Sequence, residues 1–339
     1  MLTVFNCGQG DASKLENEFC VFDSNSPLYI DLGPSTFTCN VNTTSINLLI
    51  THSHDDHVCG VFKNSNQFII DNLYIPAYFP EIYKIKMKLL KKTMAFPLKF
   101  RSVHLLYENS SFGSCQHMEV LNPPLNPNEI FSKKDTIFIE DEDIAYFLRK
   151  YDTSIDDIIN QDTPFDGLIY PEGYSERLFV LLAVGVIMKL TKNGNVPINK
   201  AYNRFIEYDA NKISVVFKFY DHVRNLVYLL TGDADRSVFN RLIKKKTCLK
   251  ANALKVPHHG SIKNLSKRIL SKISPSVAII SHDNGKFGKA KDTHPNSEVI
   301  KLLNKQSIDV YYTNDVKKNG SVIYSLYTGT INSINTRIV

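Results

Sequence analysis

The stretch that decides the fold is T-H-S-H-D-D-H at residues 51–57, which completes an apolar run, I-N-L-L-I-T. Neutral imidazole and carboxylate are ligands that divalent zinc, iron and manganese accept. His52 and His54 lie two positions apart on an extended turn and can face one metal, whereas Asp56 and His57 lie further round the turn and can reach a second. Burying these polar side chains together for no chemical reason would be costly. The stretch therefore predicts metal binding at the end of a strand.

The pattern H-x-H-x-D-H after an apolar strand resembles the signature of the metallo-β-lactamase fold, an αββα sandwich. Three further landmarks occur in the family's order. The resemblance implies that Asp31, in Y-I-D-L-G, supports the metal-binding loop and that Asp233, in L-L-T-G-D-A-D, bridges two metals. It also implies that His258, in V-P-H-H-G-S, is the late histidine of the second metal. We therefore predict an α/β protein with the metallo-β-lactamase αββα sandwich.

Further motifs narrow the resemblance. C-G-Q-G-D-A near the start, L-L-T-G-D-A-D, L-K-V-P-H-H-G-S, and I-I-S ending at Ser281 and followed by the H-P of His294, together resemble the lactamase-like nuclease domain of the ComEC competence protein family. The similarity covers roughly residues 1–125 and 211–305. The membrane channel of that family has no counterpart in this chain, so DNA uptake is not implied.

The chain departs from the family pattern at two positions. Asn6 stands where the family usually opens with an aspartate, so a role for that carboxylate is not carried over. The third ligand of the first metal has no clear counterpart, because Asn122 occupies its place in the pattern and is a poorer ligand. His104 and His117 are interpreted as surface histidines. We therefore expect the first metal to bind more weakly than the second.

Residues 126–210 match nothing in the family and differ in character. They include an acidic stretch at 140–143 and an apolar run at 178–190. We predict an inserted, mostly helical subdomain there, between the first half (1–125) and the second half (211–339) of the metallo-β-lactamase domain. Patterning also predicts a helix over Pro80–Phe96 and strands over Ile46–Thr51, Ile213–Tyr220, Leu226–Thr231 and Ser276–Ser281.

The net charge of +6 is divided unevenly along the chain. Residues 129–177 contain 5 Lys and Arg against 13 Asp and Glu, whereas residues 178–339 contain 26 against 10. Such a split suggests a basic surface for an anionic partner and an acidic element that can face it. The alternative is two ordinary solvated surfaces.

Several features predict a cytoplasmic protein with no membrane association. The N-terminus has no basic segment followed by an apolar stretch, and six scattered cysteines without a C-x-x-C pair indicate reduced thiols. The apolar run at 178–190 is shorter than the roughly 20 residues that a bilayer needs, so it predicts a buried helix.

The predicted cofactors are two divalent metal ions, zinc or manganese. Two ions held roughly 3.5–4 Å apart would share a hydroxide and the Asp233 carboxylate, and coordination would lower the pKa of the bound water towards about 7. The predicted metal ligands are His52, His54, Asp56, His57, Asp233 and His258.

The remaining candidate residues surround these ligands. His259 is a ligand, a supporting partner or a phosphate contact, and Ser261 belongs to a turn whose backbone N–H groups can face an anion. His294 is a general acid or phosphate-orienting group, or only stabilises the turn before Pro295; we group it with Asp56 as catalytic. Asp11, in G-Q-G-D-A, supports the site or the turn.

The leading functional prediction is a metal-dependent hydrolase, a phosphodiesterase or nuclease using a metal-bound hydroxide. Besides the motifs, it rests on basic residues that flank the H-H-G-S turn: Lys244, Lys245, Lys246, Lys263, Lys267, Arg268 and Lys272. Such contacts give phosphate affinity without sequence specificity.

Two alternatives remain open. The fold hosts many chemistries, so the substrate can instead be an uncharged lactam, lactone or thioester. The chain can also be a module that is inactive alone and regulated by a protein partner, with the acidic segment 129–177 lying over the basic face. More simply, the inserted residues 126–210 can form a wall of the site or a contact between subunits of an oligomer.

Overall fold

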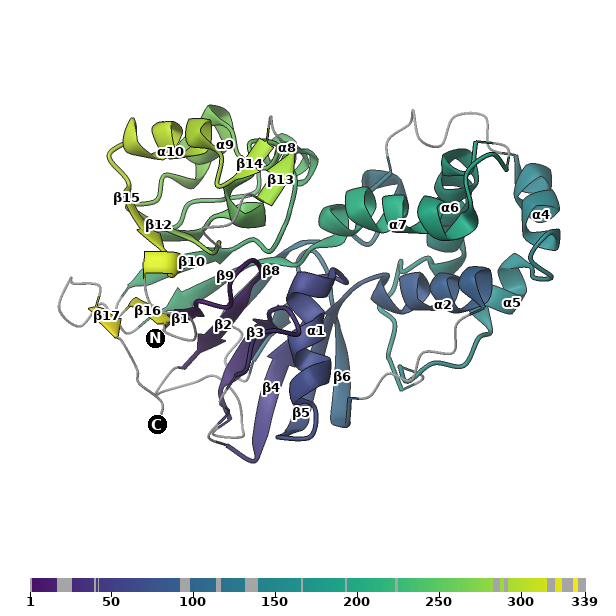
Figure 1. Ribbon diagram of the computed structural model, residues 1–339, viewed down its shortest axis with the longest axis horizontal. Coiled ribbons are helices and arrows are strands. Elements are labelled where there is room, and N and C mark those ends of the chain that lie inside the picture. The colour runs from purple at the N-terminus through teal and green to yellow at the C-terminus, as the bar shows by residue number, and fades with distance from the viewer. Residues whose placement is uncertain are drawn as a thin grey trace.

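The structure is a computed structural model, shown as a ribbon in Figure 1. It describes residues 2–16, 26–39, 41, 43–91, 98–113, 117–131, 140–165, 167–192, 194–222, 225–282, 287–289, 292–315, 321–324 and 332–334.

Two large sheets form the centre of the molecule. In the first sheet the strand order is β17 (Asn332–Ile334), β16 (Ser321–Tyr324), β1 (Leu2–Phe5), β2 (Ala12–Leu15), β3 (Leu28–Leu32), β4 (Ser45–Leu49), β5 (Ile69–Pro76) and β6 (Phe100–Leu106). Neighbouring strands from β17 to β3 are antiparallel, and those from β3 to β6 are parallel. In the second, the order is β15 (Asp309–Tyr312), β12 (Val277–Ile280), β11 (Ala253–Lys255), β10 (Leu226–Leu230), β9 (Val216–Asp221), β8 (Met118–Asn122) and β7 (Ser111–Phe112).

The strands form where apolar residues run almost without interruption. β3 is buried along its whole length and β4 is buried at all but its first residue, as expected for strands covered on both faces. The predicted strands over 46–51, 226–231 and 276–281 correspond to β4, β10 and β12. The strand predicted from Ile213 begins only at Val216, because η2 (Ala210–Ile213) is a 3-10 helix. A separate hairpin pairs β13 (Phe287–Lys289) with β14 (Asp292–His294).

Three apolar cores define four layers. One core lies between the sheets and includes Val4, Ile30 and Phe217. A second lies between the first sheet and α1 (Asp55–Asn64), and a third packs the second sheet against α8 (Arg236–Lys244), α9 (Lys267–Ile273) and α10 (Ser297–Asn304). Figure 1 shows these helices on the outer faces of the two sheets. The architecture is the αββα sandwich of the metallo-β-lactamase fold, as predicted.

A fourth core belongs to a group of helices beside the sandwich (Figure 1). It contains α4 (Asp141–Arg149), α5 (Ile155–Ile159), α6 (Glu176–Leu190), α7 (Ile198–Asp209) and also α2 (Phe79–Leu90). The apolar run at 178–190 is indeed a largely buried helix, α6. The helix predicted over 80–96 ends at Leu90, and residues 92–97 lie outside the described part of the chain.

The buried contacts of α2 explain why it joins the inserted helices. Lys84 pairs with Glu176 at 2.7 Å, and the buried Glu81 accepts a hydrogen bond of 2.7 Å from Tyr174. Within the described residues, none of the helices combines the length and the apolar character needed to cross a bilayer. The cysteines recorded as free are Cys7, Cys39, Cys59 and Cys248.

Candidate metal centre

The candidate site lies where strands of both sheets end. The histidine stretch follows β4, and His54 precedes α1, so that Asp55 and Asp56 occupy the first turn of that helix. Carboxylates are stabilised at a helix N-terminus by the exposed N–H groups there. The second sheet contributes Asp233 just after β10 and the turn η3 (Pro257–Gly260) just after β11. Short segments fixed by strand ends thus bring the predicted residues together.

His52, His57 and Asp233 form the buried centre of the site. Nε2 of His52 lies 3.7 Å from Oδ2 of Asp233, and Nε2 of His57 lies 3.4 Å from Oδ1. These two nitrogens and Oδ1 of Asp233 are buried without a hydrogen-bond partner. Unpaired buried polar atoms are costly and rare, so their convergence calls for a cation among them. The three residues can hold a metal ion.

Asp31 fixes the orientation of His57. Its carboxylate accepts hydrogen bonds from the Thr51 backbone N–H at 2.8 Å, the Thr51 hydroxyl at 2.6 Å and Nδ1 of His57 at 2.8 Å. Because Nδ1 carries the donated proton, Nε2 faces Asp233. Asp31 thus holds the ring of His57 in one orientation, and hydrogen-bond partners of this kind typically set the tautomer of ligating histidines.

His52 and His54 are oriented in different ways. The Thr51 hydroxyl donates to Asp31 and therefore accepts from Nδ1 of His52 at 3.0 Å, which leaves Nε2 of His52 with a free lone pair. Nε2 of His54 lies 2.9 Å from the carbonyl oxygen of Ile206 on α7. A carbonyl oxygen only accepts, so Nε2 of His54 carries the proton and Nδ1 keeps the lone pair. The contact with α7 thus determines which nitrogen of His54 keeps a lone pair.

His258 and His259 approach the centre from two sides. His259 joins Asp56 and His57 in a second group able to hold a metal, with Nε2 at 3.3 Å from Oδ2 of Asp56 and Nδ1 at 2.9 Å from the carbonyl oxygen of Ser281. His258, which we expected at the second metal, places Nε2 at 3.7 Å from Oδ2 of Asp233 and belongs to neither group.

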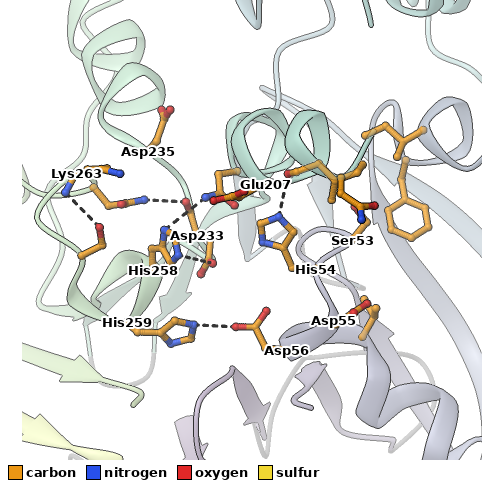
Figure 2. A pocket seen from close by; sticks show the side chains of 18 of the residues that line it. Ser53, His54, Asp55, Asp56, Glu207, Asp233, Asp235, His258, His259 and Lys263 are labelled. Carbon is orange, nitrogen blue, oxygen red and sulfur yellow. Dashed lines mark hydrogen bonds and ion pairs between the residues drawn. The ribbon is translucent and has the colours of Figure 1, made fainter. Parts of the chain in front are cut away.

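The turn that carries these two histidines has an unusual backbone. His258, His259 and Gly260 have φ angles of 47°, 53° and 81°. Non-glycine residues in this left-handed region cost roughly 1–3 kcal/mol each and persist where the surroundings require them. Here the conformation aims two consecutive imidazoles into one site, as Figure 2 shows.

Charges around the site shift several pKa values. Burial alone would lower the pKa of His57, but Asp233, Asp31 and Asp56 raise it well above its ordinary value. The pKa of His259 is likewise raised against burial, through its hydrogen bond with Asp56 and the charge of Asp11. Burial would raise the pKa of Asp233, yet neighbouring histidines hold it well below its usual range. Protons on His57 and His259 thus occupy positions that a metal would take.

The opposite shift occurs at two other histidines. Burial and the neighbouring imidazoles of His57 and His54 lower the pKa of His52 well below its ordinary value, so it is neutral. Burial also lowers the pKa of His258. A neutral imidazole is the form that ligates a metal.

The other predicted residues lie around this centre. Asp11 is buried, forms an ion pair of 2.7 Å with Lys255 and lies 3.8 Å from Nδ1 of His259. Ser261 donates its backbone N–H to the carbonyl oxygen of His258 at 2.9 Å. The ring of His294 lies edge-on to that of His258, with centroids 4.8 Å apart.

Three residues considered earlier lie elsewhere. Asn122 is buried and uses both polar atoms of its side chain: Nδ2 donates to the carbonyl oxygens of Lys212 and Ser214, and Oδ1 accepts from Arg241 at 2.8 Å. It therefore fastens β8 and is not a ligand. His104 stacks on Tyr74, and His117 lies next to His222.

The site opens into a cleft of about 810 Å³. One wall comes from α2 and α7 and is largely apolar, with Phe79, Ile82 and Tyr83. The opposite wall carries Arg236 and Lys263. Figure 2 shows the labelled side chains around this cleft.

Sequence reasoning missed Lys255, Asn211 and Glu207. Asn211 places Nδ2 at 3.4 Å from Nδ1 of His258, and its Oδ1 is buried without a partner. Turning this amide by half a turn would let Oδ1 accept from Nδ1–H and would free Nε2 of His258 as a ligand. Asn211 opens the N-K-I-S-V-V stretch, which also fits the family pattern, but nothing in that stretch marks its amide as part of the site. Glu207 lies four positions earlier and outside any recognisable motif.

Comparison with known proteins gives limited matches. No protein-family model matches the chain. Over 97 residues, 29% of this chain, it is 33% identical to ComE operon protein 3 of Bacillus subtilis (strain 168), and the match spans 12% of that protein. It is similar to the structure of a long form RNase Z from yeast with a TM-score of 0.40 and 9% identity, covering 84% of this chain and 36% of that one. The chain thus matches only a minor part of the length of either protein.

Proposed function

We propose that the protein is a metal-dependent phosphodiesterase that acts as a nuclease with two divalent ions, zinc or manganese. The observation that carries the proposal is the convergence of buried, unpartnered atoms of His52, His57 and Asp233 beside a second group formed by Asp56, His57 and His259. Imidazole nitrogen and carboxylate oxygen suit both metals.

The donors divide naturally into two sets. Nε2 of His52 and Nδ1 of His54 would hold one ion, and Asp56, His57 and a histidine of the H-H-G turn would hold the other, with the Asp233 carboxylate available to both. When bound, such ions supply a water acidic enough to attack at neutral pH and neutralise charge that develops on a phosphate. The chain's own part is to orient the imidazoles and to keep Asp233 ionised.

His294 is suited to a proton-transfer role. It lines the cleft, is near His258, and belongs to neither group that can hold a metal. We assign it the donation of a proton to the leaving oxygen, or a hydrogen bond that orients the phosphate.

Exposed cations favour an anionic polymer as the substrate. Lys263 and the partly buried Arg236 line the cleft. Exposed basic residues also lie on or next to α8 and α9: Lys244, Lys246, Lys267, Arg268 and Lys272. Lys245 is partly neutralised by Glu108 and Glu129. Phosphate contacts of this kind predict binding that weakens steeply with salt.

The positions of the acidic and basic helices bear on the alternative in which the acidic segment 129–177 lies over the basic face. Figure 1 shows the acidic helix α4 at the opposite end of the molecule from α8 and α9. In this arrangement α4 does not cover the basic surface. Helix α7 instead lines the cleft, which suits an insertion that forms a wall of the site.

The test is a substrate screen with protein loaded with zinc, manganese or magnesium. We expect cleavage of bis-nitrophenyl phosphate and of at least one of single-stranded DNA, duplex DNA and RNA, abolished by a chelator. Metal-loaded protein that leaves every phosphodiester intact but opens a chromogenic lactam would overturn the proposal in favour of an uncharged substrate.

A further inference from the structure

In the proposed function His52 and His54 belong to the first metal alone, and Asp233 is shared between the two metals. The second metal has three ligands of its own, so the first is one short of that number. His52 and His54 present one lone pair each, and zinc sites of the catalytic kind usually have three protein ligands. The position expected from the sequence is Asn122, but both polar atoms of that side chain are committed to buried hydrogen bonds. A third ligand that belongs to the first metal alone would therefore come from another part of the chain.

The carboxylates that line the cleft narrow the choice. Among the described residues these are Asp55, Asp56, Glu207, Asp233 and Asp235. Asp56 meets His259, Asp233 lies between the two ligand sets, and Asp235 caps α8 by accepting from the backbone N–H groups of Ser237 and Val238. Asp55 lies on the far side of His54 in Figure 2. Glu207 remains.

Glu207 is placed on the correct side of the site. It directly follows Ile206, whose carbonyl oxygen accepts from His54 at 2.9 Å, so α7 is anchored against that histidine. Figure 2 shows Glu207 between His54 and Asp233, with its carboxylate directed into the cleft. Nε2 of His52, the other histidine nitrogen of this metal, is buried and has no hydrogen-bond partner, so a cation beside it would satisfy it.

We propose that Glu207 is the third protein ligand of the metal held by His52 and His54. The inference rests on the proposed two-metal site but goes beyond it, because it assigns a ligand to the inserted helices. A carboxylate from α7 would replace the side chain that Asn122 cannot supply. The same helix would then orient His54 through Ile206 and complete its metal through Glu207, so that metal binding ties the insertion to the sandwich.

The experiment is a calorimetric titration of metal-stripped protein with zinc, comparing wild type, Glu207→Gln and Asp55→Asn. Both variants remove one negative charge from the same cleft, so Asp55→Asn is the matched control. We expect one of two binding steps to weaken roughly 100-fold in Glu207→Gln, with the other step and the melting temperature of the stripped protein unchanged. In Asp55→Asn both steps should stay within about threefold of wild type.

A second readout is the visible absorption of cobalt-substituted protein, which reports ligand type and geometry. We expect the spectrum of one of two bound cobalt ions to change in Glu207→Gln only. The assignment of Glu207 would be overturned if Glu207→Gln kept both zinc-binding steps and the cobalt spectrum of wild type. It would also be overturned if Glu207→Gln and Asp55→Asn weakened zinc binding equally. Wild type that binds no metal would instead overturn the proposed function itself, which keeps the two failures distinct.

Discussion

At His57, a fully buried imidazole is placed between two carboxylates with different tasks. Asp31 accepts the Nδ1 proton at 2.8 Å, whereas Asp233 faces Nε2 at 3.4 Å. The hydrogen bond to Asp31 sets the tautomer of His57, and the Asp233 carboxylate stabilises a positive charge next to Nε2 of His57. His57 is the residue shared by both groups that can hold a metal, so its orientation governs the whole site.

Replacing Asp31 by asparagine should weaken metal binding. The amide preserves the size of the side chain but presents only one oxygen, while Thr51 and His57 together direct three donors at the carboxylate. We expect roughly 10–100-fold lower zinc affinity by calorimetry. Asp309→Asn, an exposed carboxylate on β15, is the control and should bind zinc like wild type. Equal affinities in all three proteins would contradict the positioning role of Asp31.

Replacing His294 by asparagine should separate catalysis from metal binding. Because His294 lies outside both metal groups, we expect unchanged zinc content and a roughly 10²–10⁴-fold lower kcat with a phosphodiester. The measurement is steady-state kinetics on protein whose metal content has been determined. Wild-type turnover would show that His294 only stabilises the turn before Pro295.

Sequence reasoning reached part of this site, and the limits have physical causes. His52, Asp56 and His57 could be recognised because they form a contiguous motif after one strand, whereas Asp31, on β3, was named through the family resemblance. The choice between His258 and His259 depends on two consecutive left-handed residues, which no local pattern predicts. The contact between His54 and Ile206 joins residues 152 positions apart and exists only in the packed molecule.

At the scale of elements, α1 approaches β3 unusually closely. The backbone N–H of Gly60 donates to the carbonyl oxygen of Gly33 at 2.8 Å, and a Cβ added at Gly60 would lie 1.8 Å from the carbonyl oxygen of Leu32. Only glycine fits at this contact. The close approach places the first turn of α1, with Asp56 and His57, against the ends of the strands.

Substituting alanine at Gly60 should therefore destabilise the fold and disturb the site. Because backbone atoms must move apart, we expect a loss of about 1–3 kcal/mol or more in the free energy of unfolding, measured by denaturant titration, and lower zinc affinity. Gly167→Ala is the matched control, since a Cβ there meets nothing within 4 Å. A Gly60→Ala protein as stable as this control would contradict the packing described.

The elements themselves were predicted with uneven success. The buried strands and α6 could be found because their apolar runs are long and continuous. The start of β9 was wrong by three residues, because the apolar Ile213 belongs to a 3-10 helix whose character is not visible in hydrophobicity. The packing of α2 with the inserted helices depends on Glu81 and Lys84, polar residues that the sequence alone would place on the surface.

For the whole molecule, histidine protonation predicts how stability varies with pH before a metal binds. His52 and His258 have lowered pKa values, so the unfolded chain binds more protons below about pH 6.5, and stability rises towards that pH. His57 and His259 have raised pKa values, so the folded chain binds more protons above about pH 6.5, and stability falls as pH rises further. The melting temperature of stripped protein should therefore peak near pH 6.5.

Metal should reverse the decline on the alkaline side. Binding displaces protons from His57 and His259, so affinity increases with pH, and a ligand that binds only the folded state stabilises it. We expect the zinc-induced rise in melting temperature, measured by differential scanning fluorimetry, to be larger at pH 8 than at pH 6. A rise that is equal at the two pH values, or larger at pH 6, would contradict the proton assignment.

The central claim, that the convergent histidines and aspartates form a two-metal hydrolytic site, is tested most directly by counting metals per chain. Protein purified without chelator and an Asp56→Ala, His57→Ala double variant should be compared by mass spectrometry of bound metal, with phosphodiester hydrolysis measured on the same samples. We predict up to about two zinc or manganese ions per wild-type chain, with hydrolysis. The folded double variant should lose the metal of the second site and all turnover. Equal metal content and equal hydrolysis in the two proteins would contradict the account.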